Sequence, residues 1–218
     1  MIHQLSIGQK WALAIGETLL SLNGYSFNNN YYFIMDEEET ASAADRLYDY
    51  WDINDKESAW STLNILYEGG HNTRFFNLHR DRLSIMSPDK QEQYISTFTE
   101  QESKNELLII QRYYDCLPRS GIHAWDLGRA SYVCYTCLQL NYIEHDKAWS
   151  YLMKNAELAQ QSYASWQEFG TAYMVGRQLW AGELDQERTE EHQWLIRNQF
   201  SDPNGPWLIL PWDTDLRN

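Results

Sequence analysis

The stretch "SWQEFGTAYMVGRQLW", residues 165–180, has the residue spacing of a helix that packs closely against a neighbour. Four residues fall at i, i+4, i+7 and i+11 and share one helix face: Trp166, Gly170, Tyr173 and Arg177. Gly176 lies one position from this face. A glycine inside a helix costs about 1 kcal/mol relative to alanine and usually marks a close approach by another segment. The stretch therefore predicts a tight helix crossing.

The second informative stretch is "HAWDLGRA", residues 123–130. If a helix begins near Ile122, Asp126 lies in its first or second turn, where the helix dipole favours a carboxylate. Arg129 follows three residues later and can pair with it. One interpretation is structural: a capped helix with an intrahelical ion pair and Trp125 packed inward. The other places a partly buried, geometrically fixed Asp–Arg pair in a functional site.

We expect these two helices to cross through their glycines. Arg177 then either caps a neighbouring helix or lies with Arg129 in one cleft. In the second arrangement, Trp125 and Trp166 are the walls of a site for a carboxylate or phosphate. The candidate ligand-binding residues are Trp125, Asp126, Arg129, Trp166, Tyr173 and Arg177.

Two histidines are candidates for acid–base chemistry together with Asp126. His71 follows Gly69 and Gly70 at the start of a predicted helix, and His123 lies at the entrance of another. A histidine at a helix start is commonly a surface or capping residue. If His71 faced Asp126, the pair could transfer protons near neutral pH.

Apolar residues recur at spacings of three and four, and alternating β-branched runs are nearly absent, so the chain is predicted to be mainly α-helical. We expect one compact domain, a bundle of about eight or nine helices with a short extended C-terminal tail. The expected helices are 5–22, 41–51, 55–68, 72–85, 88–115, 122–140, 146–161, 163–181 and 185–200. Short strands are expected, if anywhere, at 24–35 and in the proline-flanked tail 206–212.

The formal net charge is -14, which disfavours binding to nucleic acid and favours encounters with basic proteins. Asp45, Asp49 and Asp52 form an acidic stripe at i, i+4 and i+7. Like charges at this spacing repel weakly, and Arg46 could reach Asp49 to relieve the repulsion. The stripe is either a solvated face or a docking surface for a basic partner.

Three cysteines are too few for a disulfide framework and favour a reducing compartment, which we take to be the cytoplasm. Cys134 and Cys137 form a CxxC pattern well inside a predicted helix, so we interpret them as buried structural residues. No signal peptide, membrane-spanning segment or common enzyme motif is evident, although signal-independent export stays open. We predict no metal site and no cofactor.

The combined pattern resembles a bacterial family called domain of unknown function 1266, which includes the YbeU and YbeR proteins. The resemblance covers about residues 40–181, with 1–35 and 182–218 as extensions. It rests on Trp60 with Leu63, "GGH" at 69–71, "AWDLGRA" at 124–130, "AW" at 148–149 and "SWQEFGTAYMVGR" at 165–177. The resemblance implies a helical domain, no established activity, and a frequent association with bacterial secretion and toxin systems.

Two hypotheses about function follow. The first is a non-enzymatic cytosolic protein that binds a basic partner through an acidic, aromatic-rich surface, for example to neutralise a toxin. The second is an enzyme or small-anion binder with a cleft around Asp126, Arg129 and Arg177. A structural subunit of a larger assembly is a third possibility.

Overall fold

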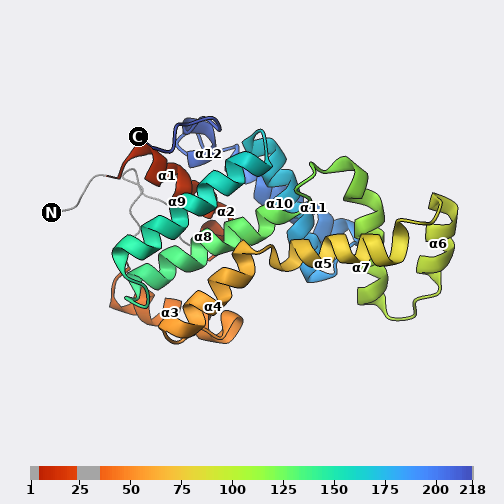
Figure 1. The fold of residues 1–218 in the computed structure, drawn as a ribbon, viewed down its shortest axis with the longest axis horizontal. Coiled ribbons are helices and arrows are strands. Elements are labelled where there is room, and N and C mark those ends of the chain that lie inside the picture. The colour runs from red at the N-terminus through yellow and green to blue at the C-terminus, as the bar shows by residue number, and fades with distance from the viewer. Residues whose placement is uncertain (1–4, 24–34, 218) are drawn as a thin grey trace.

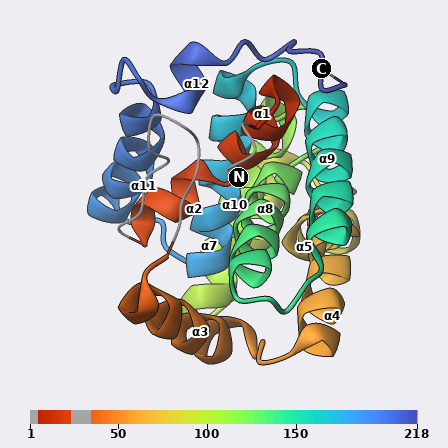
Figure 2. The same cartoon turned by 90° about the vertical axis from the view of Figure 1, so that its left-hand side faces the viewer.

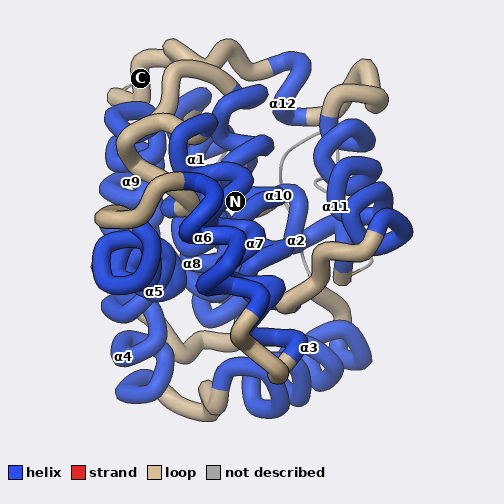
Figure 3. The backbone as a smooth tube through the Cα atoms, turned by 90° about the vertical axis from the view of Figure 1, so that its right-hand side faces the viewer, coloured by secondary structure: helices blue, strands red, loops and turns tan. Residues whose placement is uncertain are grey.

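The structure, a computed structural model, describes residues 5–23 and 35–217, which form helices and loops without any strand (Figure 3). The helices of the first half are α1 (Ile7–Ala14), α2 (Glu17–Leu22), α3 (Glu37–Trp51), α4 (Lys56–Tyr67), α5 (Gly70–Leu78), the π-helix η1 (His79–Leu83) and α6 (Pro88–Ser96). Those of the second half are α7 (Gln101–Tyr113), the 3-10 turn η2 (Tyr114–Cys116), α8 (His123–Gln139), α9 (His145–Ser162), α10 (Trp166–Ala181), α11 (Gln186–Gln199) and α12 (Pro206–Ile209). The predicted mainly helical class is confirmed.

The crossing of α8 and α10 lies in the middle of the molecule, and glycines bring the two helices together. A Cβ on Gly176 would lie 2.3 Å from Cβ of Trp125, and one on Gly128 would lie 2.6 Å from Cε2 of Tyr173. Neither distance leaves room for a methyl group. The predicted tight crossing is therefore confirmed. Gly170, however, faces Ile196 of α11 and Trp207 of α12 instead of α8.

Other helices surround this crossing. In Figure 2, α9 lies on one side of α8, and α10 and α11 lie on its other side. Helix α12 is at one end of the molecule, and α3 and α4 are at the opposite end. The larger hydrophobic core lies among these helices and includes Trp11, Leu63, Leu127, Leu152 and Phe169.

A second, smaller core lies where α5, α6 and α7 extend to one side of the molecule (Figure 1). Its buried residues include Phe75, Leu83, Ile95, Leu107 and Val175. Because Val175 belongs to α10, that helix contributes to both cores. Helix α5 contacts α4 and α8 of the larger region and α7 of the smaller one, so it lies between the two.

Two expected helices are interrupted. The expected helix 5–22 breaks between α1 and α2, where a Cβ on Gly16 would lie 3.1 Å from the backbone nitrogen of Tyr132. The expected helix 88–115 breaks between α6 and α7, where the Glu100 side chain accepts a hydrogen bond from the Ser103 amide and caps α7. The helices are consequently more numerous than the expected eight or nine.

The C-terminal tail differs from the extended segment that we expected, because residues Pro206–Ile209 form a helical turn. The tail does pack on the body: Trp207 is buried, stacks on Trp166 at 5.2 Å and donates to the carbonyl oxygen of Ala14 at 2.8 Å. The other expected strand region, 24–35, lies outside the described residues apart from its last position. In the described ranges, no helix is both long enough and apolar enough to span a bilayer.

Candidate functional site

The site is built around the first turn of α5, which Asp126 of α8 caps. Gly69 has a φ of 94° and turns the chain into α5. The Asp126 carboxylate then accepts hydrogen bonds from the backbone N–H groups of His71 (3.1 Å) and Asn72 (2.9 Å). These N–H groups have no acceptor within their own helix, so Asp126 takes the place of an N-cap residue from another helix. Gly70 permits this approach, since a Cβ there would lie 3.0 Å from Oδ1 of Asp126.

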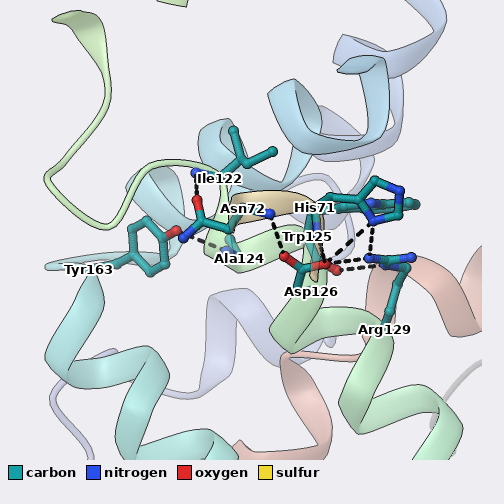
Figure 4. A network of polar contacts seen from close by, with 8 residues as sticks. All are labelled: His71, Asn72, Ile122, Ala124, Trp125, Asp126, Arg129 and Tyr163. Atoms are coloured by element: carbon teal, nitrogen blue, oxygen red, sulfur yellow. Dashed lines mark hydrogen bonds and ion pairs between the residues drawn. The ribbon is translucent and has the colours of Figure 1, made fainter. Parts of the chain in front are cut away.

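Arg129 completes a buried polar network with Asp126 (Figure 4). Its Nη2–H groups donate to Oδ1 of Asp126 and to Nδ1 of His71, the latter at 2.7 Å, and its Nε–H faces the Trp125 carbonyl oxygen at 3.3 Å. The guanidinium carbon lies 4.5 Å from the ring centroid of Trp125 and 5.4 Å from that of Trp51. Aromatic rings on both α3 and α8 thus hold the cation in place.

Asp126 is 0% exposed, and its charge is stabilised by its surroundings. Burial alone would raise the pKa of this carboxyl group. The charge of Arg129 and the hydrogen bonds from the backbone N–H groups of His71 and Asn72 outweigh burial, so the pKa lies below its ordinary value. Asp126 is therefore a carboxylate that clamps α5 onto α8.

A second set of contacts secures the start of α8 beside the clamp (Figure 4). The Asn72 side chain accepts from the backbone N–H of Ile122 at 2.9 Å. The Tyr163 hydroxyl accepts from the Ala124 N–H at 2.8 Å and donates to the Gly121 carbonyl oxygen at 3.1 Å. The network thus ties α5, α8 and the end of α9 into one rigid unit.

An open pocket of about 740 Å³ lies over this clamp. Residues from α3, α4, α5 and α8 line it: Tyr48, Asp49, Tyr50, Trp51, Asp52, Thr62, Ile65, Leu66, Gly70, His71, Arg74 and Arg129. We refer to it as the α3–α5 pocket. The structure thus brings together two of the acidic stripe residues with His71 and Arg129.

The charges of the α3–α5 pocket are unequally compensated. Arg129 pairs with Asp126. Arg74 donates two hydrogen bonds, at 2.9 and 2.7 Å, to Glu106, which lies outside the pocket. Within the part of the chain that the structure describes, neither Asp49 nor Asp52 forms an ion pair. Both lie at the C-terminal end of α3, which has no basic residue in its last turn. The uncompensated charge of the pocket is therefore negative.

Large side chains stand exposed beside these carboxylates. Tyr50 is 78% exposed, and Tyr48 of α3 and Ile65 of α4 are also more than half exposed. Asp45, the third residue of the acidic stripe, is exposed one turn earlier on α3 but does not line the pocket. The Arg46 side chain donates to Ser42 at 2.6 Å and not, as we expected, to Asp49.

The remaining candidates lie elsewhere. Arg177 does not line the α3–α5 pocket and lies near Tyr173 and His192. Burial raises the pKa of Tyr173 and lowers that of His192 to about 4, and the charge of Arg177 lowers both to a smaller extent. Among the described residues, the hydroxyl of buried Tyr173 finds no hydrogen-bond partner. Trp166 belongs to an aromatic cluster with Trp11, 4.9 Å away. The two arginines of the predicted cleft therefore do not share this pocket.

His123 begins α8 and lies near Gly69, where burial lowers its pKa, but it does not line the pocket. Cys134 and Cys137 are buried, as predicted, and form no disulfide, and burial raises the pKa of Cys137 to about 12. In the described ranges, no three His, Cys, Asp or Glu side chains are placed to hold a metal ion.

Sequence reasoning missed Tyr48, Tyr50, Trp51 and Arg74 as pocket residues. For three of them the signal was present in "YDYWD", residues 48–52, where three aromatic and two acidic residues are interspersed at the end of a helix. The fold and site thus define a helical protein with an acidic, aromatic-lined pocket over a buried Asp–Arg clamp.

The comparison with protein families matches residues 46–212 to the family described as "Protein of unknown function (DUF1266)". The chain belongs to this family. The match extends past the C-terminal limit of 181 that we expected and includes α11 and α12. Searches of curated proteins and of solved structures gave no match.

Proposed function

We propose that the protein binds a basic segment of another protein, with a lysine or arginine side chain entering the α3–α5 pocket. The observation that carries this proposal is the pair of unpaired carboxylates, Asp49 and Asp52, in a pocket whose own cations are neutralised by Asp126 and Glu106. A cationic side chain would supply the missing charge.

The position of these carboxylates strengthens the argument. The C-terminus of a helix carries a partial negative charge, so acidic residues there are unfavourable unless a cation is near. In α3 the stripe residues occupy the C-terminal half, and the last turn has no basic residue. The resulting negative potential, added to the net charge of -14, would attract a basic partner and accelerate its encounter.

The exposed aromatic residues fit the same role. Tyrosine is common at the energetic centres of protein interfaces, and a cation over an aromatic ring gains about 0.5–1 kcal/mol at an exposed site. Tyr48 and Tyr50 stand beside the two carboxylates, and Ile65 adds apolar surface from α4. A basic side chain could therefore lay its aliphatic part on these groups and its charge between the carboxylates.

The biological setting is part of the proposal. The motif similarity to YbeU and YbeR and the free cysteines support a bacterial protein that works in the cytoplasm. The association of such proteins with secretion and toxin systems supports an immunity or effector role, with a basic toxin as the partner. A cytoplasmic fluorescent fusion in a bacterial host tests the location.

The alternative, an enzyme or small-anion binder around Asp126, Arg129 and Arg177, has less support. Both oxygens of Asp126 already accept hydrogen bonds, and its charge neutralises Arg129. Arg177 lies outside the pocket. An anion at Arg129 would also lie near the uncompensated carboxylates of α3.

A titration with a basic peptide tests the proposed function. The probe is an acetylated and amidated peptide with three arginines separated by glycines, measured by calorimetry at low and high salt. Binding should weaken as salt rises. The double variant Asp49→Asn/Asp52→Asn should lose about tenfold in affinity, which equals about 1.4 kcal/mol.

The matched control is Glu92→Gln/Glu157→Gln, which removes the same charge from exposed positions on α6 and α9. It should retain nearly all the affinity. An equal loss in both double variants would reduce the effect to net charge, and no loss in either would refute the proposal.

A further inference from the structure

The contacts of the His71 ring determine which of its nitrogens carries the N–H proton. Its Nδ1 lies 2.7 Å from Nη2 of Arg129. A guanidinium nitrogen can only donate a hydrogen bond, so Nδ1 must accept it. In this arrangement the ring N–H is on Nε2.

This Nε2–H is available to a ligand. The His71 side chain is 31% exposed and lines the α3–α5 pocket, while Nδ1 is turned toward Arg129 and Asp126 (Figure 4). Because Nε2 lies across the ring from the Nδ1 contact, the Arg129 interaction leaves it free. Among the described residues, Nε2 makes no hydrogen bond.

The clamp fixes this donor in place. Asp126 holds the backbone of His71 through its N–H and holds Arg129 through an ion pair, and Arg129 holds the ring. A donor that is already oriented loses little entropy when it binds an acceptor. The pocket thus presents two carboxylates on the α3 side and one oriented N–H donor on the α5 side.

A basic residue within a peptide matches this arrangement, because it has a cation at the tip of its side chain and a carbonyl oxygen on its main chain. We propose that His71 donates its Nε2–H to a main-chain carbonyl oxygen of the bound segment, while the cationic side chain lies between Asp49 and Asp52. His71 would then make the pocket selective for a peptide over an isolated cation. This inference rests on the proposed function and adds a specificity-determining residue to it.

The experiment compares two probes on the same variants. One is acetyl-Gly-Arg-Gly-amide, and the other is propylguanidinium, which has a similar cation without any carbonyl group. Binding is followed by the indole N–H chemical shift of Trp51, which lines the pocket. His71→Phe should lower the peptide affinity about tenfold and leave the propylguanidinium affinity unchanged.

Two further variants separate the role of His71 from that of the two carboxylates. His71→Gln keeps an acceptor for Arg129 and a donor for the ligand, and should recover part of the peptide affinity; it also replaces His71→Phe if that variant unfolds. Asp49→Asn/Asp52→Asn should weaken both probes. If His71→Phe weakens both probes equally, or neither, the role of His71 is refuted while the proposed function stands. If the Asp49/Asp52 variant binds both probes normally, the proposed function itself is refuted.

Discussion

Asp49 and Asp52 line the α3–α5 pocket and Asp126 lies beneath it, paired with the pocket residue Arg129, and the two kinds of carboxylate are in opposite circumstances. Asp126 is buried and receives hydrogen bonds from two backbone amides and an arginine. Asp49 and Asp52 are exposed and form no ion pair with any described side chain. The first carboxylate stabilises the fold, and the other two are those that we propose to bind a basic ligand. The buried, hydrogen-bonded carboxylate and the two exposed carboxylates without an ion pair thus belong to neighbouring parts of one site.

The largest expected effect is the loss of the buried carboxylate. Asp126→Ala leaves Arg129 buried without its partner and removes the cap of α5, so we expect a loss of about 3–5 kcal/mol in the free energy of unfolding. Urea denaturation measures it. Asp45→Ala, an exposed change on α3, is the control and should stay within about 0.5 kcal/mol. A loss below about 1 kcal/mol for Asp126→Ala would contradict the clamp.

Acid should weaken the same clamp. Because the pKa of Asp126 is lowered in the folded protein, its contribution to stability is complete above the pKa of the unfolded chain, about 3.9. The contribution is lost as the pH falls from there through the folded-state value, by at most about 1.4 kcal/mol per pH unit. The stability difference between the wild type and Asp126→Asn should therefore shrink in this range. A difference that stays constant down to low pH would show that the charge of Asp126 contributes nothing.

The smallest effect is expected for the exposed carboxylates. Asp49→Asn/Asp52→Asn removes negative charge from the C-terminus of α3, so thermal unfolding should show no loss of stability or a gain of up to about 1 kcal/mol. The same variant should bind the basic peptide about tenfold more weakly. A clear destabilisation would place these residues among the supports of the fold and end the contrast with Asp126.

The helices that cross at the centre were predictable because their patterns are local. The expected segments 122–140 and 163–181 agree closely with α8 and α10, and Gly176 correctly indicated the crossing. The break at Gly16 was not predictable, because it depends on the approach of α8, which is distant in sequence. The break before α7 depends on Glu100 as a cap, a residue type that gives a weak signal.

The site was predictable in its residue types and not in its connections. Spacing correctly placed Arg129 next to Asp126, but it assigned Asp126 to the dipole of its own helix. The structure shows it capping α5, whose amides lie 54 and 55 residues away in sequence. No periodicity within one helix reports such a contact. For the same reason the stripe on α3 was visible, whereas its position opposite His71 was not.

Helix α10 contributes to both cores and therefore affects how the protein unfolds. Phe169 and Tyr173 belong to the larger core, and Val175 and Leu179 belong to the smaller one. The α5–α7 region therefore cannot detach without exposing one face of the helix on which the rest is assembled. Amide hydrogens in the middle of α10 should accordingly exchange only when the whole chain opens, and more slowly than those of α6.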